Sequence, residues 1–309
     1  MPNQPLRSSV FSFGETCLPS PLQRFQPDWA GAEQVELWIK RDDLIHPIVS
    51  GNKWRKLSAV LGSYADRTGA LPAHIISFGG GFSNHLHALG FLCHTADIRF
   101  TAIVRGHYQH NPTPMLRDLM QWGTDLSYVN KTDYRQRSEA PYLAALQQRY
   151  PEALVIPEGG SAQEALTGMS QLVEEIRGGL ATFDHIACPV ASGATLAGIA
   201  AALQGREQAL GIAVLKGQEY LETLVEKLSP HAPANWHIDH AHCGQGYAKT
   251  SPELTQFCSD LQCQYALAVE PVYSGKLFMG IRKKLAAGDF TPGSRIVLVH
   301  TGGLQGARR

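Results

Sequence analysis

Apolar and polar positions recur along the chain with two periods, which predict strands and helices in alternation. Short apolar runs are bounded by glycine, proline or charged residues, and longer stretches between them carry apolar residues three or four positions apart. This alternation is typical of an α/β fold, in which helices cover both faces of a mostly parallel sheet. The expected strands are residues 74–78, 100–104, 126–129, 154–156, 185–190, 211–215, 265–269 and 295–300.

The clearest helix is predicted at residues 162–177. Ser161 and Glu164 have the spacing of a capping box, in which each side chain bonds a backbone N–H of the first turn. An apolar stripe follows at helical spacing and is expected to face the core. It consists of Ala165, Leu166, Met169, Leu172, Val173 and Ile176.

Composition narrows the class of protein. With 309 residues, 44% hydrophobic and 17% charged, the chain is expected to be a soluble globular protein, and its length favours two lobes. Lys plus Arg and Asp plus Glu both number 27, so no overall field favours nucleic acid or an anionic membrane. No apolar run approaches the roughly 20 residues that span a bilayer, and no targeting pattern precedes the first strand. The expected location is the cytoplasm.

Cysteine and histidine offer one metal alternative. The six cysteines show no Cys-x-x-Cys pair, so reduced thiols are expected. His237, His240, His242 and Cys243 are close enough in sequence to suggest zinc. Residues 236–242 alternate as in a strand, which would place His240 and His242 on one face without a second ligand pair. The favoured interpretation is therefore that the protein binds no metal.

The first of three glycine-containing turns, residues 50–56, precedes an amphipathic helix. Lys53 is thus expected at a helix start, where the partial positive charge favours a neutral, nucleophilic amine. The neighbouring Arg55 and Lys56 are expected to act in the same direction. The alternative is a basic cluster on the surface.

The second and third turns follow predicted strands. Residues 77–85 place Ser83 and Asn84 at a helix start after three glycines, without a dinucleotide fingerprint or a hydrolase Gly-x-Ser-x-Gly. Ser83 is alternatively a simple N-cap. Residues 190–198 present Ser192, Gly193 and Thr195 at another helix start, which predicts a site for a single phosphate.

Hydroxyl groups at two further strand ends, Thr301 and Tyr273, complete the pattern. A reactive lysine, a monophosphate site and several hydroxyl groups together indicate pyridoxal 5'-phosphate, an aldehyde cofactor that carries one phosphate.

Six motifs of the sequence carry a resemblance to a known family. They are Lys-Arg-Asp-Asp at 40–43, Ser-Gly-Asn-Lys at 50–53, Ser-Asn-His at 83–85, the phosphate turn, Pro-Val-Tyr at 271–273 and His-Thr-Gly-Gly-Leu at 300–304. In this order they resemble the 1-aminocyclopropane-1-carboxylate deaminase and D-cysteine desulfhydrase family, from about residue 18 to 304. The resemblance implies a two-domain fold of the tryptophan synthase β-subunit type, fold type II of pyridoxal phosphate enzymes, and a homodimer. Residues 1–57 and 161–309 would form the large cofactor-binding domain, and residues 58–160 a smaller inserted α/β domain.

The resemblance also implies roles for individual residues. Lys53 would bind the cofactor covalently, and Asn84 would contact its 3-hydroxyl. Ser83 would bind the carboxylate of a small amino-acid substrate or act on the substrate. The phosphate would be held by Ser192, Gly193, Ala194 and Thr195, with Lys56 within reach. Tyr273 and Tyr247 would flank cofactor and substrate.

Two departures from the family bear on the substrate. Ring-opening members resemble Tyr-Glu-Gly-Lys where this chain has Ser274 after Tyr273, and Ser-Asn-Gln where it has His85. A hydroxyl from Ser274 or Thr301 can only hydrogen-bond the cofactor ring nitrogen, whereas a carboxylate keeps it protonated. The prediction is a lyase that converts D-cysteine to pyruvate, ammonia and hydrogen sulfide. The alternatives are cyclopropane ring opening to 2-oxobutyrate and ammonia, and a cofactor-binding protein without useful turnover.

Overall fold

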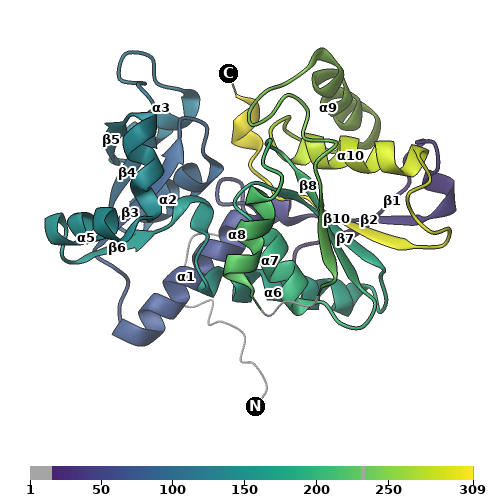
Figure 1. The fold of residues 1–309 in the computed structure, drawn as a ribbon, viewed down its shortest axis with the longest axis horizontal. Coiled ribbons are helices and arrows are strands. Elements are labelled where there is room, and N and C mark those ends of the chain that lie inside the picture. Colours follow the sequence, from purple (N-terminus) through teal and green to yellow (C-terminus); the bar gives the residue numbers. More distant parts are fainter. Residues whose placement is uncertain (1–15, 231–233, 309) are drawn as a thin grey trace.

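The computed structural model describes residues 16–230 and 234–308; residues 1–15, 231–233 and 309, all within the predicted large domain, lie outside the described residues. Two sheets lie side by side in Figure 1. The larger has six strands in the order β1-β2-β10-β7-β8-β9. Its strands are β1 (Leu22–Phe25), β2 (Glu36–Lys40), β7 (His185–Val190), β8 (Gln208–Ala213), β9 (Trp236–Asp239) and β10 (Arg295–Val299).

All neighbouring pairs of the larger sheet are parallel except β1 and β2. The smaller sheet has four parallel strands in the order β5-β4-β3-β6. They are β3 (His74–Gly80), β4 (Arg99–Arg105), β5 (Asp125–Val129) and β6 (Ala153–Ile156). The smaller sheet thus comes from one continuous stretch of chain, whereas the larger takes strands from both sides of that stretch.

Helices cover both faces of each sheet, because successive strand residues point to opposite faces. In β7, Ile186 packs with α6 (Glu164–Gly179), α7 (Ala194–Ala202) and α8 (Tyr220–Leu228), while Ala187 packs with α9 (Pro252–Tyr265) and α10 (Ser274–Ala286). In β3, Ile75 packs with α1 (Gly51–Thr68), α2 (Asn84–Thr95) and α3 (Pro114–Gln121), while Ile76 faces α4 (Lys131–Arg135) and α5 (Ala140–Arg149). This arrangement confirms the predicted α/β class.

All the predicted strands but one are present, with ends shifted by up to three residues. The strand predicted at 265–269 is wrong, because α9 continues to Tyr265 and ends at Ala266 in a left-handed conformation with φ of 52°. The residues that follow are largely buried but belong to no strand. The strands β1 and β2 were not among those predicted.

The predicted capping box of α6 is also wrong. The helix begins at Glu164, and its N-cap, Gln163, makes no side-chain capping bond. The amides of Ala165 and Leu166 donate instead to the carbonyls of Ala162 and Gln163 in a tight first turn. Ser161 Oγ is buried without a hydrogen-bond partner in the part of the chain that the structure describes. The predicted apolar stripe of this helix is buried throughout.

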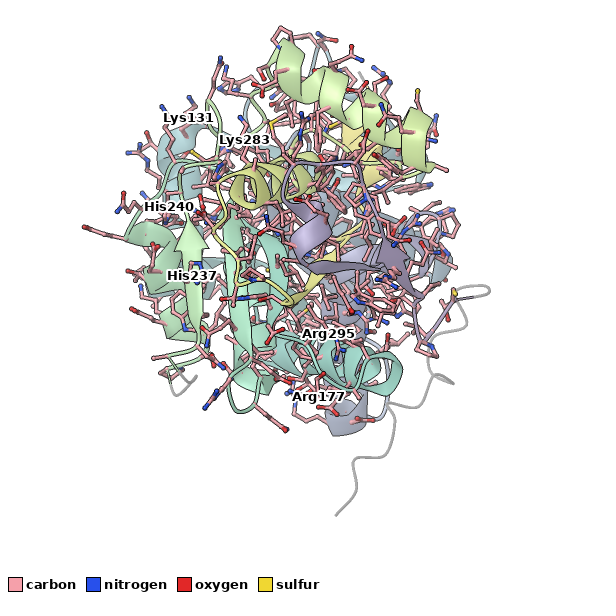
Figure 2. All side chains as sticks on the ribbon, turned by 90° about the vertical axis from the view of Figure 1, so that its right-hand side faces the viewer. Lys131, Arg177, His237, His240, Lys283 and Arg295 are labelled. Atoms are coloured by element: carbon pink, nitrogen blue, oxygen red, sulfur yellow. The ribbon has the colours of Figure 1, made fainter. Side chains whose placement is uncertain are left out.

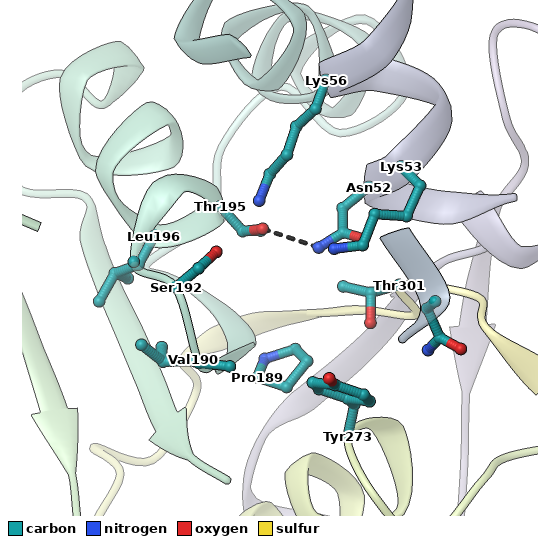
Figure 3. Close-up of a pocket in the computed structure, with 13 residues that line it drawn as sticks. Asn52, Lys53, Lys56, Pro189, Val190, Ser192, Thr195, Leu196, Tyr273 and Thr301 are labelled. Atoms are coloured by element: carbon teal, nitrogen blue, oxygen red, sulfur yellow. Dashed lines mark hydrogen bonds between the residues drawn. The ribbon is translucent and has the colours of Figure 1, made fainter. Parts of the chain in front are cut away.

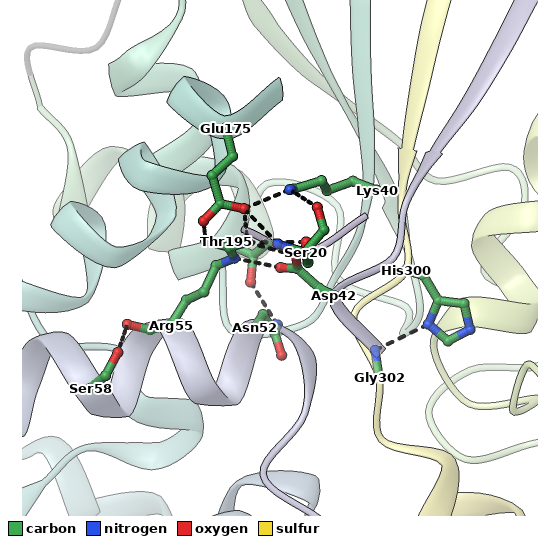
Figure 4. Close-up of polar contacts among 10 residues, drawn as sticks. All are labelled: Ser20, Lys40, Asp42, Asn52, Arg55, Ser58, Glu175, Thr195, His300 and Gly302. Carbon is green, nitrogen blue, oxygen red and sulfur yellow. Dashed lines mark hydrogen bonds and ion pairs between the residues drawn. The ribbon is translucent and has the colours of Figure 1, made fainter. Parts of the chain in front are cut away.

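A buried ion cluster fixes α1 against the larger sheet (Figure 4). Arg55 of α1 binds Asp42 through Nε at 2.6 Å and Glu175 of α6 through Nη1 at 3.0 Å. Lys40, at the end of β2, donates to Glu175 at 2.6 Å and to the carbonyl of Ser20 at 2.6 Å. Two cations and two carboxylates therefore balance in a site where an unpaired charge would be costly.

The cluster also corrects one expectation. Arg55 was expected to act on the Lys53 amine, but its guanidinium is engaged by Asp42 and Glu175. Burial, not Arg55, is the cause of the shifted pKa of Lys53.

No helix within residues 16–230 and 234–308 is long and apolar enough to cross a membrane.

Candidate active site

A cleft lies where the carboxyl ends of β7 and β10 approach the first residues of α1, α2, α7 and α10 (Figure 3). Ligand sites of parallel α/β proteins typically lie at this edge of the sheet. The cleft encloses about 420 Å³ of empty space, part of it open to solvent. Its lining residues are Asn52, Lys53, Lys56, Asn84, Pro189, Val190, Ala191, Ser192, Gly193, Thr195, Leu196, Tyr273 and Thr301.

Lys53 is the third residue of α1, and its amino group points into the cleft (Figure 3). Its position depends on Gly51, which has φ of 65° and lies against the backbone of Thr301. A Cβ at Gly51 would lie 1.8 Å from the Thr301 carbonyl oxygen, so only glycine allows α1 to begin here. Burial lowers the pKa of Lys53 to about 8, so a far larger share of the amine is neutral near physiological pH than in an ordinary lysine.

The opposite end of the cleft is the first turn of α7. Gly193, with φ of 78°, is the N-cap and supplies no side-chain capping bond, so backbone N–H groups of this turn are available to a ligand. Thr195 Oγ1 accepts a hydrogen bond from Asn52 Nδ2 at 2.8 Å. Its hydroxyl proton is therefore available to a second acceptor.

Lys56 lies beside this turn and points toward Thr195 and Ser192 in Figure 3. It is only 1% exposed, and within the described residues it has neither a hydrogen bond nor an ion pair. Burial and the nearby Lys53 lower its pKa well below the ordinary value. A buried lysine beside free helix N–H groups is a site for an anion such as phosphate, whose charge would favour the protonated amine.

Asn84 and Ser83 lie at the start of α2. Asn84 lines the cleft, and its Oδ1 accepts a hydrogen bond from Gln305 Nε2. Ser83 is the N-cap of α2, and its hydroxyl oxygen accepts from the amide of Leu86 at 3.2 Å. The N-cap interpretation of Ser83 is thus confirmed.

Two tyrosines meet at the side of the cleft near α10. Tyr273 lines the cleft, and its hydroxyl lies 2.8 Å from that of Tyr247. Burial raises the pKa of both phenols, so both remain protonated at neutral pH. One of the two hydroxyl protons is used between the rings, and the other is available to a ligand.

Ser274 has a different environment. It is fully buried, and its hydroxyl lies 3.2 Å from Glu270 Oε1. Glu270 accepts three further hydrogen bonds, from the amides of Val272, Tyr273 and Ser274. These bonds oppose burial, which raises the pKa of Glu270. At the edge of the cleft itself, the hydroxyl side chain is Thr301.

His85 is buried on the side of α2 that faces the smaller sheet. Ser77 donates its only hydroxyl proton to the carbonyl of Ile156 at 2.7 Å, so its oxygen must accept from His85 Nε2, also at 2.7 Å. Nδ1 is therefore the unprotonated nitrogen of a neutral ring. Burial and the charges of Lys53 and Lys56 lower the pKa of His85 in agreement with this tautomer.

The histidines that suggested zinc have other partners. His237 is exposed on β9, at the edge of the larger sheet (Figure 2), and the strand ends at Asp239. The expectation that His240 and His242 share a strand face is therefore wrong. His240 binds Glu222 at 2.7 Å, and His242 binds Asp239 at 2.9 Å. Within the described ranges, no three His, Cys, Asp or Glu residues are arranged to hold a metal ion.

The cleft brings together most of the residues singled out in the sequence. Ser83, Ala194, Tyr247 and Ser274 are not among the described lining residues, although Ala194 is the first residue of α7 and Tyr247 touches Tyr273. Sequence reasoning missed the contributions of Asn52, Glu270 and Gln305. Asn52 lies within the Ser-Gly-Asn-Lys motif and Glu270 directly precedes the Pro-Val-Tyr motif, but no sequence signal connects Gln305 to Asn84.

A family model for pyridoxal-phosphate dependent enzymes matches residues 16–302 of the chain. The chain belongs to this family. This pyridoxal-phosphate dependent enzyme is 28% identical over 331 residues to the bifunctional D-cysteine desulfhydrase/1-aminocyclopropane-1-carboxylate deaminase, mitochondrial, of Arabidopsis thaliana, covering 98% of this chain and 80% of the relative. It is 27% identical over 307 residues to a putative 1-aminocyclopropane-1-carboxylate deaminase of Pyrococcus furiosus, covering 93% and 90%.

A solved structure supports the fold of this pyridoxal-phosphate dependent enzyme. The crystal structure of an ACC deaminase homologue matches with a TM-score of 0.79 at 24% identity and covers 99% of this chain and 97% of the other. These matches confirm the predicted fold class, an α/β protein of fold type II with parallel sheets flanked by helices. They also confirm the predicted cofactor.

The cleft of this pyridoxal-phosphate dependent enzyme fits its cofactor. The unpaired Lys56 and the first turn of α7 match the charge and the acceptor oxygens of a phosphate. Lys53 offers an amine for the aldehyde. The intervening space is lined by Asn84, Tyr273 and Thr301, whose polar groups can bind ring substituents.

Proposed function

We propose that this enzyme eliminates the β substituent of a small amino acid, and that D-cysteine is the substrate, giving pyruvate, ammonia and hydrogen sulfide. The observation that carries the proposal is the pairing of the Lys53 amine, with a pKa of about 8, with a cleft whose described lining residues include no Asp or Glu. The name of the Arabidopsis relative, which includes D-cysteine desulfhydrase, supports it.

Lys53 has two proposed roles, covalent attachment of the cofactor and removal of the substrate α proton. Bound pyridoxal phosphate supplies the electron sink that stabilises negative charge at the α carbon. An amine with a pKa near the working pH is suited to accept and return a proton. The phosphate is proposed to be held by Ser192, Gly193, Ala194, Thr195 and Lys56. The 3-hydroxyl of the cofactor is proposed to be held by Asn84.

The remaining residues are proposed to act on the substrate. The Ser83 hydroxyl, whose oxygen accepts from the Leu86 amide and whose proton is therefore left for a ligand, would bind its carboxylate. Tyr273, kept protonated by burial and oriented by Tyr247, would donate a proton to the departing sulfur. A thiolate is a good leaving group, so the step needs only a moderate electron sink.

Ring opening of the cyclopropane substrate demands more. That substrate has no α hydrogen, so the reaction requires attack or proton loss at a ring carbon and a stronger sink. The ring nitrogen would face the hydroxyl of Thr301 at the cleft edge, whereas Ser274 is fully buried and its hydroxyl bonds Glu270. Poor ring opening is therefore part of the proposal.

The test supplies D-cysteine, L-cysteine and 1-aminocyclopropane-1-carboxylate separately to the purified holoenzyme and measures sulfide and keto acid. We expect sulfide and pyruvate with D-cysteine, less with L-cysteine and little 2-oxobutyrate from the cyclopropane substrate. The variant Lys53→Ala is the control for catalysis by free cofactor. Production of 2-oxobutyrate without sulfide from either cysteine would favour the deaminase, and no product from any substrate would favour a binding protein without turnover.

The domain and assembly predictions remain proposals. Residues 58–160 are proposed as the smaller inserted domain, and residues 1–57 and 161–309 as the large one; the continuous origin of the four-stranded sheet supports this division. A cytoplasmic homodimer is proposed for the assembly. Light scattering should give about twice the chain mass of 33.7 kDa.

A further inference from the structure

The chain after β10 crosses from the larger sheet to the helices of the smaller one, between the two sheets in Figure 1. We name residues 302–308 the carboxyl-terminal strap. Gly303 donates its amide to Ser50 Oγ at 3.2 Å, just before α1. At the other end, Arg308 binds Asp118 of α3 and lies 3.3 Å from His87 of α2. The strap is thus anchored on both sides of the cleft.

Between these anchors the strap holds one cleft residue, Asn84. Gln305 Nε2 donates to Asn84 Oδ1. Gly303 lies so close that an added Cβ would be 2.1 Å from Asn84 Nδ2. The carboxamide is therefore confined on two sides, and its oxygen is occupied by Gln305.

The orientation of this amide matters chemically. A carboxamide presents a donor at one end and an acceptor at the other, and it can bind opposite ligand groups when it flips. With Oδ1 held by Gln305, the N–H groups of Nδ2 are the end of Asn84 that remains for a ligand in the cleft. An oxygen that accepts a hydrogen bond is the matching ligand group.

We propose that Gln305 is a positioning residue that fixes the Asn84 carboxamide with its N–H toward the 3-hydroxyl oxygen of the cofactor. This inference rests on the proposed function, because it takes Asn84 as a ligand of the cofactor. Gln305 touches neither cofactor nor substrate and acts only through Asn84. The anchors of the strap at Ser50 and Asp118 keep Gln305 in place.

The test uses three variants of the full chain. Gln305→Ala removes the donor and frees the amide. Gln305→Glu replaces the donor with an acceptor. Asn84 must then turn its N–H to the carboxylate and present Oδ1 to the 3-hydroxyl oxygen of the cofactor. Leu304→Ala, at an exposed neighbour on the same strap, is the matched control. Cofactor dissociation constants come from titration of cofactor-free protein, and absorbance maxima come from the loaded proteins without substrate.

We expect Gln305→Ala to weaken cofactor binding about 10-fold, the usual scale for one hydrogen bond in a low-dielectric site. Gln305→Glu should weaken it further and shift the absorbance maximum, while Leu304→Ala should match the wild type. Introduced into Asn84→Ala, Gln305→Ala should cost nothing more, since the two act on one contact. Melting temperatures check folding, and Gln305→Met serves if the alanine variant fails to fold.

Three results would overturn the inference: wild-type affinity and spectrum in both Gln305 variants, an equal loss in Leu304→Ala, or additive losses in the double variant. Failure of the proposed function would look different. In that case the wild type itself would bind no cofactor at Lys53, as judged by borohydride reduction and peptide mapping. Wild-type attachment at Lys53 with unchanged Gln305 variants refutes only the positioning role.

Discussion

At the scale of single residues, one short stretch of α1 directs three basic side chains into three different environments. Lys53 faces the cleft, Arg55 faces two carboxylates, and Lys56 lies buried without a partner among the described residues. Helical geometry sends neighbouring residues in different directions, so the same basic stretch supplies a nucleophile, a structural ion pair and an anion ligand. The surface-cluster alternative for these residues is wrong.

Lys53 gives the first prediction. Borohydride reduction of the holoenzyme should fix the cofactor on Lys53, located by mass spectrometry of peptides. Since the neutral amine is the nucleophile, the rate at which cofactor-free protein captures pyridoxal phosphate should rise with pH through about 8 and then level off. Lys53→Ala should lower turnover by about 1,000-fold or more while retaining noncovalent binding.

An adduct on another lysine would refute this assignment. Lys276 is the informative comparison, because its amino group already donates to the carbonyls of Val214 at 2.9 Å and Gly246 at 2.6 Å. Its side chain is buried, is held by these two acceptors and does not line the cleft.

Much of the cleft could be predicted from residue types at the starts of helices. Lys53, Asn84 and Thr195 stand at such starts, where backbone polarity itself defines the chemistry. Ser274 shows where this reasoning ends. Its hydroxyl bonds Glu270, four residues earlier, because the turn before α10 directs three amides onto that carboxylate and so holds it beside Ser274.

At the scale of elements, hydrophobic runs located the buried central strands but not the sheet edge. The strand β1 has only one buried residue, and β2 ends in the buried Lys40, which reads as a surface position in the sequence. Lys40 is tolerated because Glu175, distant in sequence, compensates its charge. Conversely, residues 265–269 have an apolar strand-like pattern, but α9 ends at Tyr265, and Leu267 and Val269 are buried without belonging to a strand.

The ion cluster between β2, α1 and α6 gives the second prediction. Glu175→Gln should lower the free energy of unfolding by about 3 kcal/mol, because Lys40 and Arg55 would share one carboxylate in a buried site. The matched control is Glu174→Gln, since Glu174 is 67% exposed and pairs with Arg177 on the surface. Its effect should stay within about 0.5 kcal/mol. Urea unfolding of the two variants measures the difference, and equal effects would contradict a structural role for the cluster.

The pH dependence has a defined sign. Hydrogen bonds and charges from Arg55 and Lys40 lower the pKa of Glu175 below the ordinary 4.5. Its contribution to stability is therefore complete above pH 4.5 and is lost as the pH falls through the folded-state pKa. Wild type and Glu175→Gln should converge in stability under acid conditions.

At the scale of the whole molecule, the cleft collects residues from both sheets' elements. Asn84 begins α2, which covers the smaller sheet. Thr195 lies in α7 and Tyr273 directly precedes α10, two helices that cover the larger sheet, and α1 lies between them. A ligand that binds these residues together stabilises the folded chain as a unit, because it binds no comparable site in the unfolded state. The end of the cleft at α7, with the unpaired Lys56, should contribute much of this stabilisation by the ligand.

The third prediction concerns the cofactor-free protein and inorganic phosphate. Phosphate should raise the melting temperature, with a gain in stability of about 1.4 kcal/mol at ten times its dissociation constant. Sodium chloride at equal ionic strength is the control and should give little response. In Lys56→Met, which keeps the length of the chain without the charge, the phosphate response should fall sharply while the protein without phosphate becomes more stable than the wild type.

Lys56→Met should be the more stable protein without phosphate because burying the Lys56 amine is costly unless a ligand compensates its charge. Burial lowers the pKa of Lys56 below the ordinary 10.5, so between the two values the unfolded chain binds more protons than the folded one. The stability of the cofactor-free wild type should therefore rise with pH toward 10.5, and its deficit relative to Lys56→Met should shrink over the same range. Melting curves from pH 7 to 10, with and without phosphate, measure both effects. An undiminished phosphate response in Lys56→Met would place the anion site elsewhere.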